Sequence, residues 1–175
     1  LMEVDTGRVI SLASLPDFDP NHRPNLPARG SAEESPLFNK AIQGVYELGS
    51  TFKIFTVAQA LELDLVDPKT KVNTKGPIRI GGHKINDYRN NGPELPVWQV
   101  ITESSNLGTA RIAKLIGPEK QKEFLSSLGF TNPTSIEMIE ASGGKPLLPK
   151  RWNELETMTI SYGHGLSATP LHLAT

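Results

Sequence analysis

The stretch from about Ser50 to Leu65 constrains the fold most, because it predicts a helix that is apolar nearly all the way round. Most of its side chains are apolar on every helical face, among them Ile54, Phe55, Val57, Ala58, Ala60 and Leu61. Such a helix belongs inside a domain rather than on its surface. Asp67-Pro68 ends the pattern, since proline does not continue a helix. The sequence therefore predicts a buried helix over residues 50–65.

The rest of the chain predicts further short helices and a few antiparallel strands. Helical patterns cover residues 96–103, 107–116, 119–128 and 153–160. Two hairpins are expected, one with strands at 1–4 and 8–13 around Asp5-Thr6-Gly7, the other with strands at 78–80 and 83–85 around Gly81-Gly82. Proline-rich residues 14–41 and residues 131–151 read as irregular connections, and Thr169-Pro170 reads as the start of a final helix.

Composition excludes several classes of function. The 18 Lys and Arg residues balance 19 Asp and Glu residues, so no basic face favours nucleic acid. No apolar run approaches the roughly 18 residues that would suggest a membrane-spanning helix within this segment. The absence of cysteine rules out disulfides, thiolate zinc sites and a cysteine nucleophile. The four histidines have no metal-binding spacing, so neither a metal nor a cofactor is predicted.

Ser50-Thr51-Phe52-Lys53 is the pattern most indicative of chemistry. Residues three apart on a helix share a face, so the Lys53 amine can reach the Ser50 hydroxyl. A neutral lysine can take the proton from a serine, provided that burial lowers its pKa from about 10.4 towards 7. Ser50 at the helix N-terminus would also lie beside free N–H groups that favour an oxyanion. A second Ser-x-x-Lys, Ser142 to Lys145, lies in a glycine-rich loop and is set aside.

Ser104-Ser105-Asn106 contains the only Ser-x-Asn in the chain and lies in a break between two predicted helices. A hydroxyl at Ser104 can relay a proton between nucleophile and leaving group, and the Asn106 amide can hold a substrate carbonyl or fix the lysine. Serine and asparagine also cap helices well, so a purely structural capping pair is the alternative.

Together, Ser50-Thr51-Phe52-Lys53 and Ser104-Ser105-Asn106 resemble the active-serine signature of penicillin-binding proteins and serine β-lactamases. Residues 5–21 and 39–53 look like the first hairpin with its loop and the approach to the nucleophile in class B penicillin-binding proteins. Residues 161–171 look like a glycine-rich segment of the septal, cell-division branch. The resemblance covers nearly the whole chain in order, with Leu48 at a position where many members have proline.

The resemblance implies an α/β (α+β) penicillin-binding protein or serine β-lactamase-like transpeptidase fold. It implies a peptidoglycan DD-transpeptidase in which Ser50 forms an acyl-enzyme, Lys53 is the base, Ser104 is a proton relay or an acid, and Asn106 positions the stem peptide. β-Lactam antibiotics would acylate the same serine. The family further implies a parent protein anchored in the bacterial inner membrane, with its catalytic domain in the periplasm and other cell-division proteins as partners.

The family's third motif, Lys-Thr/Ser-Gly, occurs nowhere in these 175 residues. With ends that read as mid-strand and mid-helix, this predicts that residues 1–175 are a partial transpeptidase domain. It would contain mainly the helical subdomain and an N-terminal β-hairpin, lack the C-terminal core strands and be inactive alone. Exposed strand edges and apolar faces would favour a dimer. Two alternatives stay open: a β-lactam sensor or hydrolase of the same superfamily, and a non-catalytic division scaffold.

Overall fold

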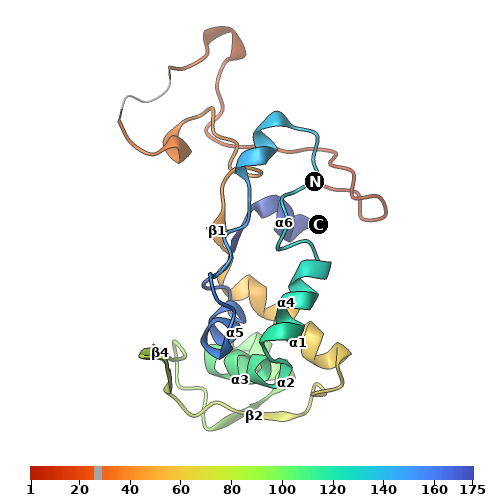
Figure 1. Ribbon diagram of the computed structural model, residues 1–175, viewed down its shortest axis with the longest axis vertical. Coiled ribbons are helices and arrows are strands. Elements are labelled where there is room, and N and C mark those ends of the chain that lie inside the picture. The colour runs from red at the N-terminus through yellow and green to blue at the C-terminus, as the bar shows by residue number, and fades with distance from the viewer. Residues whose placement is uncertain (26–28) are drawn as a thin grey trace. The chain divides into compact units, whose positions relative to one another are not determined.

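The computed structural model describes residues 1–25 and 29–175, which form two compact units, each assembled from separate stretches of chain (Figure 1). The helical unit consists of residues 47–127 and 148–166. The terminal unit consists of residues 1–46, 128–147 and 167–175. Strand β1 (Tyr46–Glu47) lies where the chain passes from one unit to the other.

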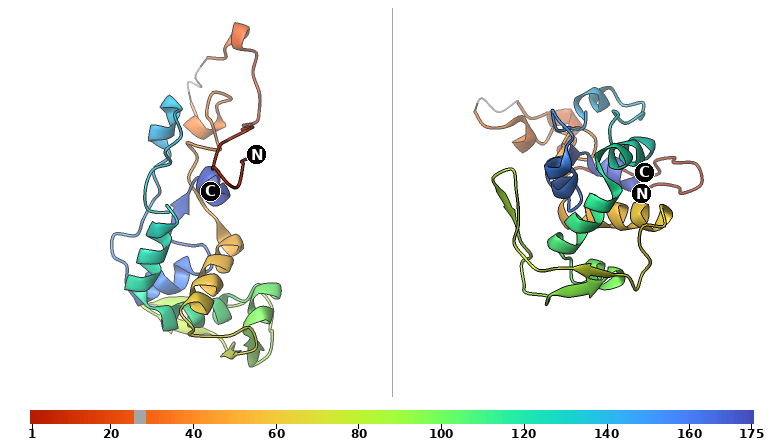
Figure 2. Two further views of the ribbon diagram at one scale, coloured as in Figure 1. Left: turned by 90° about the vertical axis from the view of Figure 1, so that its right-hand side faces the viewer. Right: turned by 60° about the horizontal axis from the view of Figure 1, so that its bottom comes forward.

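Five helices build the helical unit: α1 (Lys53–Glu62), α2 (Val97–Thr102), α3 (Asn106–Ile116), α4 (Pro118–Ser127) and α5 (Glu154–Ile160). Helix α1 continues from a 3-10 turn, η3 (Gly49–Phe52). Helix α3 packs against both α1 and α5, as Figures 1 and 2 show. The core between α1, α2 and α3 is made of small and branched apolar side chains, including Val57, Ala60, Val97, Val100, Ile112 and Ile116.

Two antiparallel strand pairs border these helices. Strand β2 (Lys71–Asn73) pairs with β5 (Glu94–Pro96), with Val72 opposite Leu95, and both of these side chains join the core. Strand β3 (Ile78–Ile80) pairs with β4 (His83–Ile85) around the predicted Gly81-Gly82 turn. Ile85 at the end of β4 packs with Leu107 and Ala110 of α3, so the end of β4 lies against the first half of that helix.

The terminal unit has little regular structure. Its described residues form β6 (Ser167–Ala168), α6 (Pro170–Ala174) and three 3-10 turns, η1 (Pro20–His22), η2 (Ala32–Glu34) and η4 (Ile139–Gly143). One cluster of its buried apolar side chains consists of Ile42, Ala141 and Leu171. Residues 14–25 and 29–41 are irregular as predicted, apart from η1 and η2, and Pro27 of the predicted proline-rich connection lies outside the described residues.

Most of the predicted elements are confirmed, because their capping signals are local. Asn153 forms a capping box at α5 and Thr169 forms one at α6, with Pro170 in the first helical position. Glycine follows α3, where Gly117 adopts a φ of 83° that other residues rarely adopt. Across residues 1–25 and 29–175 the structure has no helix that is long and apolar enough to cross a membrane.

Two predictions are wrong in detail. The N-terminal hairpin has a single bridge, Met2 to Val9, instead of two strands, and Val4 is 97% exposed. Within the described residues it gains no third strand, and an isolated two-stranded ribbon is marginal in water. The helix over 50–65 is not buried on all sides, because Ile54 remains 53% exposed. It also begins as a 3-10 turn rather than as an α-helix.

Helix α3 offers a matched test of this core. Replacing Ile112, which is fully buried, by alanine should lower the free energy of unfolding by about 2–5 kcal/mol, because it leaves a cavity. Leu115→Ala on the same helix removes a side chain that is 58% exposed and should have little effect. Urea denaturation followed by tryptophan fluorescence measures both, since Trp98 and Trp152 both lie in the helical unit. Equal losses for the two variants would contradict the assigned core.

Candidate active site

Ser50 and Lys53 meet at the start of the first long helix. Ser50 lies in η3 and is exposed, whereas Lys53 is the first residue of α1 and is only 2% exposed. Their separation of three residues places both side chains on one face, and Lys53 Nζ donates to Ser50 Oγ at 3.2 Å. The exposed hydroxyl of Ser50 therefore lies beside the Lys53 amine, which is almost inaccessible to water.

Ser104 approaches the same amine from the turn between α2 and α3. Lys53 Nζ donates to Ser104 Oγ at 2.8 Å and to the Ser104 backbone oxygen at 2.5 Å. Ser104 has a φ of 54°, a left-handed conformation that costs a non-glycine residue about 1–2 kcal/mol. Strain of this kind is concentrated at functional sites. Here it accompanies the approach of both oxygens of Ser104 to the lysine.

Burial makes Lys53 easier to deprotonate than an exposed lysine. Loss of hydration disfavours the ammonium form and lowers the pKa of Lys53 from 10.5 to about 8, although the negative charge of Asp87 opposes the change. A lysine with this pKa is partly neutral near physiological pH and can accept a proton. The pair Ser50 and Lys53 thus has the geometry and the protonation behaviour of a nucleophile with its general base.

Asp87 is the main residue that sequence reasoning missed. It follows β4, and its two carboxylate oxygens accept hydrogen bonds from Ser105 Oγ at 2.7 Å and from the Leu107 backbone N–H at 2.8 Å. These bonds fix the beginning of α3 and hence the turn that carries Ser104. An aspartate between Asn86 and Tyr88 reads as an ordinary loop residue, so no signal in the sequence distinguished it.

Asn106 lies at the first position of α3, where its side-chain amide donates to the backbone oxygen of Asn86 at 3.1 Å. The residue that caps α3 is Ser105, whose hydroxyl accepts from the Gly108 N–H at 2.9 Å. Glu103, not Ser104, is the C-cap of α2. The capping alternative for Ser104 and Asn106 is therefore wrong, because Ser105 and Glu103 occupy the two cap positions between these helices.

One hollow of about 390 Å³ brings the four predicted residues together. Ser50, Lys53, Ser104 and Asn106 all line it, with Tyr88 and Arg89 from the loop after β4. Arg89 adds a positive charge to this lining, and Glu103 adds a negative one. Among the described residues, no group of three or more His, Cys, Asp or Glu side chains could hold a metal ion. The chemistry of this hollow is that of a serine, an amine and a second hydroxyl.

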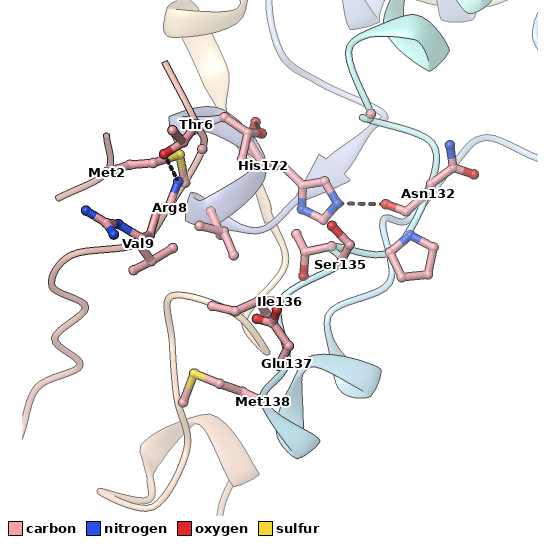
Figure 3. A pocket seen from close by; sticks show the side chains of 16 residues that line it. Met2, Thr6, Arg8, Val9, Asn132, Ser135, Ile136, Glu137, Met138 and His172 are labelled. Atoms are coloured by element: carbon pink, nitrogen blue, oxygen red, sulfur yellow. Dashed lines mark hydrogen bonds between the residues drawn. The ribbon is translucent and has the colours of Figure 1, made fainter. Parts of the chain in front are cut away.

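A larger hollow of about 730 Å³ lies in the terminal unit but has different chemistry (Figure 3). His172 is its one imidazole, and both ring nitrogens are engaged: Nδ1 with Thr169 Oγ1 at 2.7 Å and Nε2 with the Asn132 backbone oxygen at 2.8 Å. Thr6, Ser135 and the other hydroxyls around it have no lysine beside them. His172 therefore ties α6 to the loop that follows α4 rather than activating a nucleophile.

Comparison with known proteins shows the family to which the chain belongs. The family described as "Penicillin binding protein transpeptidase domain" matches residues 1–175. The chain is 34% identical over 171 residues to the probable peptidoglycan D,D-transpeptidase FtsI of Caulobacter vibrioides, and 32% identical over 174 residues to the peptidoglycan D,D-transpeptidase FtsI of Escherichia coli K12. These alignments cover 98% and 99% of this chain but only 28% of each relative, so the chain spans little more than a quarter of their length.

Two solved structures are similar to this chain in both fold and sequence. The transpeptidase domain of penicillin-binding protein 3 from Burkholderia pseudomallei is similar with a TM-score of 0.69 and 37% identity, over 78% of this chain and 41% of that one. A structure named as a peptidoglycan glycosyltransferase from Burkholderia ambifaria has a TM-score of 0.72 and 36% identity, over 79% and 44%. The expected α/β transpeptidase fold is thereby confirmed.

The electrostatic role of Asp87 can be tested directly. Because the charge of Asp87 raises the pKa of Lys53, Asp87→Asn should shift that pKa below its value of about 8. Asp64→Asn removes an equal charge from an exposed position of the same unit and should leave the Lys53 pKa unchanged. NMR titration of the lysine side chains measures both midpoints. A Lys53 midpoint that is the same in wild type and Asp87→Asn would refute the assignment.

Proposed function

The chain belongs to the penicillin-binding protein transpeptidase family, and we propose that it carries the catalytic centre of a peptidoglycan DD-transpeptidase that β-lactam antibiotics inhibit. The observation that carries this proposal is the single buried amine of Lys53, which lies within hydrogen-bonding distance of both Ser50 Oγ and Ser104 Oγ. Acyl transfer from one amine to another needs a nucleophile, a base and a proton relay. The substrate is the D-Ala-D-Ala end of a stem peptide.

Acylation begins with neutral Lys53. Its amine takes the proton of Ser50 as Oγ attacks the carbonyl carbon of the penultimate D-Ala, forming a tetrahedral intermediate. The peptide C–N bond then breaks, and the leaving amine of the terminal D-Ala receives a proton through Ser104 Oγ, which lies 2.8 Å from Lys53 Nζ. An ester between Ser50 and the stem peptide remains, and free D-Ala departs. With a β-lactam, the broken C–N bond belongs to the ring, so no fragment leaves.

Transfer to the acceptor reverses these proton movements. The amine of a second stem peptide attacks the ester carbonyl, its proton passes through Ser104 to Lys53, and Ser50 regains its proton as the ester bond breaks. Asn106, which lines the hollow, presents an amide to the backbone of the bound peptide. Arg89 in the same hollow supplies a positive charge for a carboxylate.

The relatives named FtsI support a septal role, and with it three further predictions: an anchor in the inner membrane, a periplasmic catalytic domain and other cell-division proteins as partners. Dimerisation of the 175-residue chain also stays a prediction.

Two alternative functions have clear tests. Turnover of the acyl-enzyme by water within minutes would favour a β-lactam hydrolase. Retained cell division with Ser50→Ala in the full-length protein would favour a scaffold, whereas loss of cross-linking supports the enzyme.

The proposed base predicts a specific pH profile. With a Lys53 pKa of about 8, the neutral fraction rises from about one tenth at pH 7 to about nine tenths at pH 9. The rate of acylation by a fluorescent penicillin, measured on the full-length protein, should therefore rise about tenfold over this range. Lys53→Arg keeps a positive charge throughout and should be inactive at every pH tested. A flat profile between pH 7 and 9 would exclude Lys53 as the base.

The absence of a Lys-Thr-Gly or Lys-Ser-Gly sequence generates a separate prediction. In the family this motif binds the substrate carboxylate and supplies part of the oxyanion hole, so residues 1–175 alone should not be acylated by a labelled penicillin. The full-length protein serves as the positive control in the same gel assay. Ready labelling of the 175-residue chain at Ser50 would show that the third motif is dispensable.

A further inference from the structure

The turn that follows α5, residues 161–165, contacts the chain on both sides of Ser50. The Gly49 N–H, directly before the nucleophile, donates to the Gly163 backbone oxygen at 3.1 Å. Upstream, the Gly165 N–H donates to Glu47 Oε1 at 2.7 Å. Downstream, the buried hydroxyl of Thr56 donates to the Ser161 backbone oxygen at 3.2 Å. Three bonds from one turn therefore fix the segment from 47 to 56, all within the helical unit.

Gly163 stands at the closest point of this contact. It is buried, and its φ of 84° lies in the region that side chains rarely adopt. A Cβ atom placed there would come closer than 3.0 Å to three backbone atoms of Gly49: O, N and C. Real Cβ atoms essentially never show such distances, and a backbone cannot rotate away as a long side chain can. Any larger residue at position 163 must therefore push Gly49 and the turn 161–165 apart.

Displacement of Gly49 moves the nucleophile but not its base. Ser50 is bonded directly to Gly49 and is exposed, so little packing would hold it in place. Lys53 is held by the buried side of α1 and by both oxygens of Ser104. A shift of Gly49 thus changes the 3.2 Å separation of Ser50 Oγ and Lys53 Nζ while the rest of the hollow stays intact. Shifts of this kind reduce reaction rates strongly, because reacting groups need close alignment.

We propose that Gly163 is a positioning residue for the nucleophile: its missing side chain lets the turn 161–165 hold Gly49, and so sets where the Ser50 hydroxyl lies relative to Lys53. Gly163 touches neither substrate nor the reacting atoms, and it acts only through the backbone of Gly49. This inference rests on the proposed function, in which Ser50 is acylated.

The test compares two glycine variants of the full-length protein. Gly163→Ala introduces the clash, whereas Gly82→Ala places a Cβ at a similar φ of 80° with no atom within 4 Å, so it reports the cost of the backbone conformation alone. Stopped-flow acylation by a fluorescent penicillin separates the limiting acylation rate constant from the dissociation constant of the initial complex. Gly163→Ala should lower the rate constant by about 10- to 100-fold and leave the dissociation constant unchanged. Gly82→Ala should change neither.

Glu47 provides a second pair that does not depend on the folding of Gly163→Ala. Glu47 is exposed, and Glu47→Gln keeps the Oε1 that accepts from Gly165, whereas Glu47→Ala removes it. Glu47→Ala should lower the acylation rate constant several-fold, and Glu47→Gln should restore it. If Gly163→Ala behaves like Gly82→Ala, or Glu47→Ala like Glu47→Gln, the positioning role is refuted. A wild-type protein that no penicillin acylates refutes the proposed function itself.

Discussion

The burial of one amine is the interaction on which this active site depends. Lys53 is almost inaccessible to water, and its ammonium form is compensated by two oxygens of Ser104 and one of Ser50. Dehydration lowers the pKa of Lys53 to about 8, so that the amine is neutral often enough to accept a proton. Each nearby element serves this arrangement: α1 presents the amine, the α2–α3 turn supplies Ser104, and Asp87 holds the start of α3.

Much of the local structure could be predicted from the sequence because its causes are local. Capping residues such as Asn153 and Thr169, and the proline at position 170, act within one turn of the helices they begin. The Gly81-Gly82 hairpin also follows from its own few residues. The pairing of Ser50 with Lys53 follows from helical periodicity alone. Ser104 and Asn106 could be found because their pattern resembles that of a known family.

What could not be predicted depends on contacts between distant parts of the chain. Asp87 reaches residues that are 18 and 20 positions away, and nothing around it marks it as different from a loop aspartate. The requirement for glycine at 163 is set by Gly49, far earlier in the sequence. The sequence does not distinguish Ser105 as the cap, because Ser104 and Asn106 are equally good capping residues. Ile54 is exposed because nothing in the helical unit covers that face of α1.

The wide sequence separation of these contacts has a consequence for the protein during its synthesis. Thr56 and Ser161 are 105 residues apart, and Glu47 and Gly165 are 118 apart. At the usual speed of translation, about 5–20 residues per second, the ribosome needs roughly 5–20 s to make the chain between them. The entropy cost of closing a loop rises only slowly with its length. The time before these contacts can form is therefore set mainly by synthesis of the intervening chain. A nascent chain therefore exposes Ser50 and Lys53 well before the turn that aligns them exists, and the nucleophile acquires its geometry only near the end of this region.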